Sequence, residues 1–419
     1  MKIAITNIVV LNGGDGAILF GMMKVLRAAF GRDTEFSVFC SQPLVAGRLF
    51  PGVRFQETLG LAACRTRFSR VRYLGRLARM AKRWRYQCVA LAVGRGLAVF
   101  SRLLPRDSRE ALADYASSDL VILGGGTYLK DEYGIESQIC DCQIAAGLRK
   151  PLVFFTQSIG PLRRADSRRL FQQVLGRVDC ILVRDQVSAD CVRGFKGPIP
   201  PLYQCADAAF ALGDGRWLRA REPAAPRNRV AVSVRQWPWF SRDVALNYRA
   251  AVARACEWLL ARGFDVTFLS TCQGNPEYTD DAEEADEIVK LLPREARDRI
   301  VVSRGFIRYD AFMRQIGSFD FVIATRLHVA ILSLISGVPV LPVAYEFKTV
   351  ELFRQLGLVD WVTEMESIQA DALVAMVERF VRCRGDLVGG GLFARVADLC
   401  DDAFKAGGYL KQHADPLHR

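Results

Sequence analysis

The sequence contains few of the residues from which metal sites are usually built. It has three histidines in 419 residues, and its twelve cysteines are dispersed without a CxxC or CxxxC pair. No zinc-type ligand set is visible, and scattered cysteines in a large α/β chain are typical of reduced thiols in a cytosolic enzyme. No uncharged run reaches the ~18 apolar residues that a membrane-spanning helix needs. The apolar residues 1–10 lead into a glycine-rich turn without a small-residue cleavage site, so no signal peptide is expected.

Acidic residues are missing from one long stretch, residues 58–106, here called the basic segment. It carries twelve Lys or Arg and no Asp or Glu, whereas the rest of the chain balances at 45 basic and 45 acidic residues. The net charge of +12 therefore lies in the basic segment alone. Apolar residues recur within it at helical spacing among the arginines: Val71, Leu74, Ala78, Ala81 and Trp84.

A more apolar run follows from Cys88 to Leu104, broken by a Gly-Arg-Gly triplet at 94–96. A basic amphipathic helix with aromatic residues on its apolar face favours an anionic membrane surface. Nucleic acid is a competing partner, but no recognised binding motif accompanies the segment. The third interpretation is an ordinary basic helix on the protein surface.

Short apolar runs of strand type alternate with helical patterns along the chain. They are Lys2–Val10, Glu35–Cys40, Asp119–Gly126, Leu152–Gln157 and Cys180–Val183, then Arg229–Arg235, Phe264–Leu269, Ile300–Ser303, Phe321–Ala324 and Val340–Tyr345. Most end in glycine or polar residues that lead into a helix, which is typical of doubly wound parallel sheets. We therefore predict two Rossmann-like α/β domains facing a central cleft, the glycosyltransferase-B architecture.

The expected domain boundaries follow from composition. Residues 1–212 form the N-terminal domain, with the basic segment as a helical insertion. Residues 213–229, rich in Gly, Pro, Arg and Ala, form a linker, and residues 230–370 form the C-terminal domain. Helices and a tail occupy residues 371–419.

The stretch from 319 to 349 is the most informative βαβ unit. Ligands bind beyond the carboxyl ends of parallel strands, where helix N-termini direct their unpaired N–H groups. Arg326 and His328 follow the first strand of this unit and Lys348 follows the second, so we expect them to converge on one anion-binding crevice. The alternative is that both cations are solvated and that His328 packs within its helix.

The other predicted strands also end in residues suited to a ligand. Glycine turns, where the backbone can approach a ligand closely, are predicted at Gly13, Gly14, Gly125 and Gly126. Asp15 is most simply a helix N-cap, with a catalytic or hydroxyl-binding role as the alternative. Polar and cationic strand ends are Gln157, Ser158, Arg184, Arg235 and Ser270.

Five segments together carry a resemblance to a known family: NGGDGAIL, LVILGGGTYL, FFTQSIGPL, LVRDQVS and TRLHVAILSLISGVPVLPVAYEFKT. With them the chain resembles polysaccharide pyruvyl transferases, and the TRLH helix with its trailing ExK is the most specific part. The basic segment is the main departure from the family pattern. The resemblance implies transfer of an enolpyruvyl unit from phosphoenolpyruvate to two hydroxyls of a sugar, giving a cyclic ketal and phosphate. No cofactor or metal is implied.

The resemblance also implies an acceptor substrate and a cellular location. The acceptor would be an exopolysaccharide or cell-wall glycan precursor, carried on a polyprenyl pyrophosphate lipid. We expect a cytoplasmic enzyme that is peripheral on the inner face of the cytoplasmic membrane through the basic segment and that does not bind nucleic acid. The rival function is a glycosyltransferase of the same architecture with a nucleotide-sugar donor; a non-enzymatic sugar-binding module would not need the clustered arginines.

The expected roles of the site residues follow from donor chemistry. Phosphoenolpyruvate carries nearly three negative charges, so its site needs several cations and N–H donors. We assign donor binding to Arg184, Arg235, Arg326, Lys348, Gln157 and Ser158. The acceptor is assigned to Gly13, Gly14, Asp15, Gly125, Gly126 and Ser270. The resemblance places the general acid at His328, with Asp15 and Lys348 as further catalytic candidates.

Overall fold

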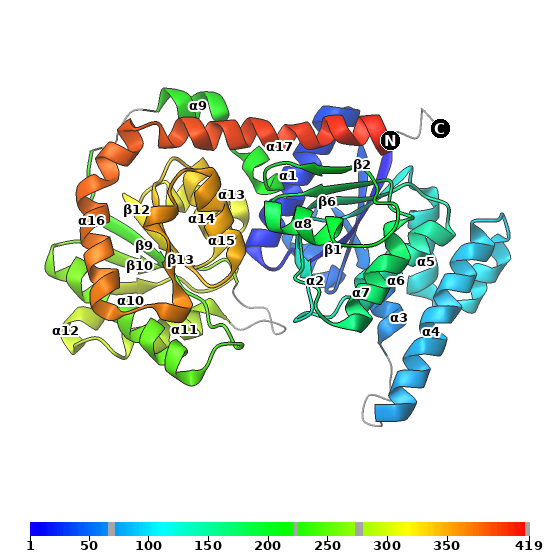
Figure 1. Cartoon of the computed structure of the whole chain (residues 1–419), viewed down its shortest axis with the longest axis horizontal. Helices are drawn as coiled ribbons and strands as arrows, with labels where there is room; N and C mark the ends of the chain where they lie inside the picture. The colour runs from blue at the N-terminus through cyan, green and yellow to red at the C-terminus, as the bar shows by residue number, and fades with distance from the viewer. Residues whose placement is uncertain (66–71, 222–224, 273–279, 415–419) are drawn as a thin grey trace. The chain divides into compact units, whose positions relative to one another are not determined.

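The computed structural model describes residues 1–65, 72–221, 225–272 and 280–414 (Figure 1). Their contacts divide the chain into two compact units. The first contains Met1–Val10, Ile18–Ala208 and the residues from Asp402 onward, and the second contains Leu11–Ala17 and Ala209–Asp401. Each unit is an α/β structure with its own parallel sheet.

The first unit is built on an eight-stranded sheet with the order β3-β2-β1-β4-β6-β7-β8, in which β5 pairs with β6. Its strands are β1 (Lys2–Ile8), β2 (Glu35–Cys40), β3 (Arg54–Glu57), β4 (Leu120–Leu123), β5 (Gly126–Leu129), β6 (Leu152–Ile159), β7 (Cys180–Val183) and β8 (Leu202–Gln204). Strands β4, β6 and β7 are buried along their whole length because helices cover both faces of a parallel sheet.

The helices of the first unit connect these strands. They are α1 (Gly13–Phe30), α2 (Pro43–Leu49), α3 (Leu59–Cys64), α4 (Arg72–Val93), the 3-10 helix η1 (Ala98–Leu103), α5 (Arg106–Ser117), α6 (Glu136–Gly147), α7 (Ala165–Leu175) and α8 (Gln186–Arg193). The first turn of α1 belongs to the second unit, and α17 (Leu392–Ala414) is likewise divided between the units at residue 401.

The second unit has a six-stranded sheet with the order β11-β10-β9-β12-β13-β14. Counted within the unit this order is 3-2-1-4-5-6, the dinucleotide-binding Rossmann order. Its strands are β9 (Arg229–Ser233), β10 (Asp265–Phe268), β11 (Ile300–Val302), β12 (Phe321–Ala324), β13 (Val340–Ala344) and β14 (Thr363–Glu364).

The helices of the second unit complete the list of elements. They are η2 (Ala208–Leu212), α9 (Gly215–Ala220), α10 (Arg242–Ala261), α11 (Asp281–Val289), α12 (Arg294–Arg297), α13 (Tyr309–Ile316), α14 (Leu327–Ile335), α15 (Phe347–Gln355), η3 (Val359–Trp361), η4 (Met365–Ser367), α16 (Ala370–Gly389) and α17. No helix in the described ranges combines the length and apolarity needed to cross a membrane.

The structure confirms the α/β prediction with two parallel sheets. Every strand predicted from an apolar run is present. The strands that the sequence did not reveal are β3, β5, β8 and β14, which have two to four residues each. Their sequences, RFQE, GTYL, LYQ and TE, are not continuous apolar runs, and their pairing with neighbours defines them.

Three local predictions are corrected. Helix α1 begins at Gly13, so Asp15 lies in its first turn and is not the predicted N-cap. Instead Asn12 Oδ1 accepts the N–H of Gly14 at 3.1 Å. The predicted linker 213–229 contains a helix, α9, whose N-cap Asp214 accepts two backbone N–H groups. His413 belongs to α17 rather than to a tail, and its Nε2 lies 2.6 Å from the hydroxyl of Tyr203.

The glycine turn after β1 packs in the second unit, whereas the sequence placed it in the first domain. The N–H of Gly13 donates to the carbonyl of Thr271 at 2.7 Å, and Asn12 forms an isolated antiparallel bridge with Cys272. These long-range backbone bonds bring the first turn of α1 to the carboxyl end of β10.

Candidate active site at the switch point of the second unit

Strands β9 and β12 are neighbours at the point where the strand order of the second sheet reverses. In doubly wound sheets the ligand crevice lies beyond the carboxyl ends of the strands at this point. Arg235 follows β9, and Thr325 and Arg326 follow β12. Buried Tyr248 of α10 connects the two strand ends, because its hydroxyl lies 2.8 Å from Thr325 Oγ1 and also accepts the backbone N–H of Arg235. Burial raises the pKa of Tyr248, so the hydroxyl that connects the two strand ends stays protonated.

Tyr345 directly follows β13 and contacts two of the predicted donor-binding cations. Nη1 of Arg235 donates to the Tyr345 hydroxyl at 2.5 Å. The guanidinium also lies 4.7 Å from the ring centroids of both Trp237 and Tyr345. Nζ of Lys348 lies 5.5 Å from the Tyr345 ring centroid. The aromatic pair therefore fixes the head of Arg235 and places Lys348 beside it.

Two predicted cations of this unit have buried counter-ions. The Nε of Arg326 donates to Asp281 at 2.9 and 3.1 Å, and its Nη2 makes a further short contact with the same carboxylate. Burial opposes the charge of Arg326, but the Asp281 carboxylate more than offsets this and raises the arginine pKa. Lys348 Nζ lies 2.6 Å from Glu346. Neither Arg326 nor Lys348 is therefore a solvated strand-end charge.

Some cationic N–H groups remain available in this cluster. Among the described residues Arg235 forms no ion pair with a carboxylate. Asp281 occupies the Nε and Nη2 edge of Arg326, and within the same described ranges Nη1 of Arg326 makes no hydrogen bond. Ser270 donates to Asp281 at 2.7 Å and so supports the counter-ion of Arg326.

The glycine turn lies directly against the predicted general acid. His328 is the second residue of α14 and is half-buried. A methyl group built on Gly14 would lie 2.6 Å from His328 Nδ1, and one on Gly13 would lie 3.3 Å from the Thr271 carbonyl. Only glycine at position 14 leaves the imidazole where it is.

The thiol of Cys272 shows how closely the charges of the site are gathered. Burial raises its pKa to about 11. The charges of Arg326 and Arg235 act to lower this pKa, and those of Asp281 and Asp15 act to raise it. Two cations and two carboxylates, one of them in the glycine turn, therefore lie within electrostatic range of one buried atom.

The remaining predicted site residues form a separate, buried cluster in the first unit. The register of β6 shifts between Phe154 and Gln157, and Thr156 there has a φ of 42°. Such a bulge re-aims the residues that follow it. Gln157 Nε2 donates to the carbonyl of Leu123 at 3.2 Å and to the hydroxyl of Tyr128 at 2.8 Å.

Arg184 is the centre of this first-unit cluster. Its Nε donates to Ser158 Oγ at 2.7 Å, its Nη2 donates to Thr127 Oγ1 at 2.6 Å, and its Nη1 forms an ion pair with Asp207. The Ser158 hydroxyl in turn donates to Asp185 at 2.7 Å. All three nitrogens of Arg184 thus bind protein groups, so its predicted role in donor binding requires a test of its own.

The structure therefore divides the predicted site residues into two sets. In the second unit lie Gly13, Gly14, Asp15, Arg235, Ser270, Arg326, His328 and Lys348; in the first lie Gly125, Gly126, Gln157, Ser158 and Arg184. Sequence reasoning missed the buried counter-ion Asp281 and the organising aromatic residues Trp237, Tyr248 and Tyr345. Trp237 and Tyr345 could have been found, since each lies within three positions of a predicted cation. No group of three or more His, Cys, Asp or Glu side chains in the described ranges is placed to hold a metal ion.

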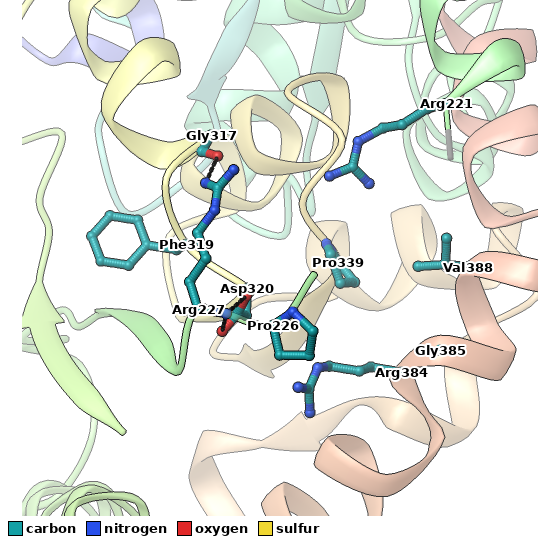
Figure 2. Close-up of a pocket in the computed structure, with 10 residues that line it drawn as sticks. All are labelled: Arg221, Pro226, Arg227, Gly317, Phe319, Asp320, Pro339, Arg384, Gly385 and Val388. Carbon is teal, nitrogen blue, oxygen red and sulfur yellow. Dashed lines mark hydrogen bonds between the residues drawn. The ribbon is translucent and has the colours of Figure 1, made fainter. Parts of the chain in front are cut away.

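A cavity of about 100 Å³ lies on a different edge of the second sheet (Figure 2). Its wall includes Phe319 and Pro339, which precede β12 and β13, so it opens at the amino ends of these strands. Figure 2 shows Arg221, Arg227 and Arg384 around it. Ligands of doubly wound folds bind at the carboxyl ends, so this cavity is not the predicted crevice.

Comparison with known proteins decides the family. The sequence profile described as polysaccharide pyruvyl transferase matches residues 12–346. The chain belongs to this family. This pyruvyl transferase is also 25% identical over 385 residues to the amylovoran biosynthesis protein AmsJ of Erwinia amylovora, over 87% of its own length and 88% of the relative. The profile match begins at the glycine turn and ends at Glu346, so it includes Arg235, Arg326 and His328 but stops two residues before Lys348.

Solved structures show the fold of this pyruvyl transferase. A putative UDP-N-acetylglucosamine 2-epimerase from Listeria monocytogenes matches with a TM-score of 0.56 at 12% identity, over 98% of this chain and 94% of the other. A sucrose-phosphate synthase from Thermosynechococcus elongatus matches with a TM-score of 0.56 at 13% identity, over 98% of each chain. These similarities confirm two Rossmann-like domains of the glycosyltransferase-B type. The family match favours pyruvyl transfer over the nucleotide-sugar glycosyltransferase that the same fold allows.

Proposed function

We propose that this polysaccharide pyruvyl transferase takes its pyruvyl group from phosphoenolpyruvate and joins it as a cyclic ketal to two hydroxyls of one sugar. The observation that carries the proposal is the gathering of Arg235, Lys348 and Arg326 at the switch point, next to the imidazole of His328. A small donor with a phosphate and a carboxylate needs several fixed N–H donors of this kind. The half-buried Arg235, held by Trp237 and Tyr345, is the best-placed anion ligand.

The proposed chemistry balances as follows. His328 gives a proton to the methylene carbon of phosphoenolpyruvate, which becomes a methyl group and leaves a cationic centre at C2. One sugar hydroxyl attacks C2 and loses its proton back to the base form of His328. The C2–O bond to phosphate then breaks, and the second hydroxyl attacks the same carbon and transfers its proton to the departing phosphate. The products are the ketal, which keeps the carboxylate, and hydrogen phosphate.

Each residue has a separate part in this reaction. Imidazole is the side chain suited to proton transfer near neutral pH. Gly14 lets the glycine turn approach His328 without displacing it, and the carboxylate of Asp15 supplies an acceptor for a sugar hydroxyl. Asp281 holds Arg326 so that its Nη1 edge is directed away from the ion pair.

The acceptor is proposed to be an exopolysaccharide or cell-wall glycan precursor on a polyprenyl pyrophosphate lipid. The similarity to AmsJ, a protein named for amylovoran biosynthesis, supports a polysaccharide acceptor. A lipid-linked precursor is presented at a bilayer surface, so the enzyme would act at the inner face of the cytoplasmic membrane. The reaction as written requires neither a metal ion nor a cofactor.

The donor can be tested by calorimetric titration and thermal shift on the full chain. We expect phosphoenolpyruvate to bind and raise the melting temperature, and UDP-sugars to do neither. Loss of one charge-assisted contact costs about 1.5–3 kcal/mol, so Lys348→Ala and Arg235→Ala should each weaken phosphoenolpyruvate binding by roughly ten- to hundredfold. Arg184→Ala, tested in parallel, decides whether the first-unit cluster also contributes.

Arg242→Ala is a matched control, because Arg242 is exposed at the start of α10 in the same unit. It should bind phosphoenolpyruvate like the wild type. A melting shift with a UDP-sugar and none with phosphoenolpyruvate would overturn the proposed donor. Unchanged titration of Lys348→Ala would remove that residue from the site while leaving the donor intact.

A further inference from the structure

Helix α4, drawn in light blue in Figure 1, has two apolar faces. One face packs in the first unit against α3 and α6 and buries Tyr86, Val89 and Ala90. The contact is close, since a methyl group built on Gly147 of α6 would lie 3.3 Å from the Cβ of Ala90. The Tyr86 hydroxyl also pairs with Ser108 at 2.8 Å. This face holds α4 on the first unit but does not account for the apolar residues that the helix exposes.

The opposite face of α4 is an exposed apolar stripe. Its members are three or four positions apart, so they share one side of the helix: Leu77, Met80, Trp84, Cys88 and Leu91. Trp84 is 69% exposed and Met80 is 57% exposed. The stripe shares Trp84 with the predicted one, of which Ala81 is also exposed and Ala78 is half-buried. Val71 and the side chain of Leu74 lie outside what the structure describes. A Trp with this exposure contributes little apolar burial to the fold of the first unit.

The 3-10 helix η1 extends the apolar surface. It packs against α4, and four large apolar side chains in and before it are exposed: Leu97, Val99, Phe100 and Leu103. Eight of the 18 exposed large apolar residues of the described chain therefore lie between residues 77 and 103. Exposed apolar residues concentrated in this way mark an interaction surface.

Cations border this surface. Arg76 and Arg83 lie on one side of the stripe and Arg85 lies on the other, at the helical spacing of about 100° per residue. Among the described residues, none of these three arginines forms an ion pair with a carboxylate. The pKa of Lys82 is lowered, first by burial and then by the charge of Arg85. The whole basic segment offers no acidic residue to neutralise them.

We propose that the exposed face of α4 together with η1, here called the docking surface, binds an anionic lipid bilayer. The apolar stripe would enter the interface between headgroups and acyl chains, and the bordering arginines would bind lipid phosphates. Nucleic acid would use the charges and leave Trp84, Met80 and Leu77 in water. The proposal deepens the proposed function by naming the surface that brings the enzyme to a lipid-linked acceptor.

The test is co-sedimentation of the full chain with vesicles of phosphatidylcholine containing about one third phosphatidylglycerol. We expect binding that weakens as salt rises, because surface charges are screened over about 10 Å at 0.1 M salt, and little binding to pure phosphatidylcholine. Leu77→Gln/Trp84→Gln should lower the affinity at least about tenfold at constant charge. Arg76→Gln/Arg83→Gln should lower it and reduce the salt dependence. Brominated acyl chains should quench more tryptophan fluorescence in the wild type than in Trp84→Phe.

Trp239→Gln is the matched control, because Trp239 is 61% exposed but lies outside the docking surface; it should bind vesicles like the wild type. Circular dichroism melting should show that every variant is folded. Equal binding to charged and neutral vesicles, wild-type binding by the Leu77→Gln/Trp84→Gln variant, or tighter binding to duplex DNA than to charged vesicles would each overturn the proposal. The measurement uses no donor or acceptor, so its failure is distinct from failure of the proposed reaction.

Discussion

Gly14 and His328 are in contact across 314 positions of the chain, and a methyl group on Gly14 would lie 2.6 Å from Nδ1 of the imidazole. The contact joins the turn after the first strand to the helix that carries the family's most specific motif. It depends on the backbone bond from Gly13 to Thr271, which seats the turn in the second unit. The glycine turn, predicted to bind the acceptor, therefore lies directly against the proposed general acid.

Gly14→Ala should reduce turnover sharply. The new methyl group would have to displace His328, and a shift of about 1 Å in a catalytic group costs about a hundredfold in rate. Steady-state kinetics would measure the loss. Gly47→Ala, where a methyl group meets no atom within 4 Å, should retain wild-type activity. Near-normal turnover by Gly14→Ala would show that the imidazole of His328 can be displaced without loss of catalysis.

His328→Gln should lower the turnover number while preserving donor binding. Glutamine keeps a similar size and a hydrogen-bond donor but cannot deliver a proton near neutral pH, and general acid catalysis contributes about a hundred- to ten-thousandfold. The variant should still show a phosphoenolpyruvate-induced melting shift close to that of the wild type. If it turns over at close to the normal rate, His328 is a packing residue and Lys348 becomes the next candidate for the acid.

Asp281→Asn should destabilise the second unit as well as impair catalysis. Removing one partner of a buried ion pair leaves the other charge uncompensated and costs about 3–5 kcal/mol. Urea unfolding would measure this loss. Glu257→Gln breaks the exposed pair with Arg254 and should cost at most about 1 kcal/mol. Equal effects of the two substitutions would mean that Arg326 is not held by Asp281 in solution.

Asp141 should give the first unit a characteristic pH dependence. Its buried carboxylate accepts the Gly60 N–H at 2.8 Å and hydroxyl or amide protons from Thr6, Asn7 and Tyr115. Burial nevertheless raises its pKa to about 7. The folded protein therefore keeps a proton that the unfolded chain has lost, so the free energy of unfolding falls as pH rises from about 4 to about 7.

Asp141→Asn should remove this contribution. The difference in unfolding free energy between wild type and variant should change by up to about 3 kcal/mol between pH 5 and pH 8, at about 1.4 kcal/mol per pH unit below the folded-state pKa. Urea titrations at both pH values would show it. Asp298→Asn, on an exposed turn, should follow the wild type. A pH-independent difference for Asp141→Asn would mean that the carboxylate is ionised throughout this range.

The sequence by itself determined the strands with continuous apolar runs and indicated the family. Apolar runs such as Cys180–Val183 and Phe321–Ala324 coincide with β7 and β12, because strands buried on both faces need continuous apolar residues. Glycine and charged residues at the strand ends indicated where ligands bind, because the carboxyl edge of a parallel sheet is the open one. The excess of positive charge in the basic segment was likewise visible as composition.

Tertiary structure alone decided how these residues are used. Pairing between residues distant in sequence gave Arg326 and Arg184 their counter-ions, and no local pattern specifies that Asp281 faces Arg326. Long-range backbone bonds moved the glycine turn into the second unit, and packing on α6 decided which face of α4 is buried. Periodicity identifies an apolar face but not its partner, since burial depends on segments brought together only by folding.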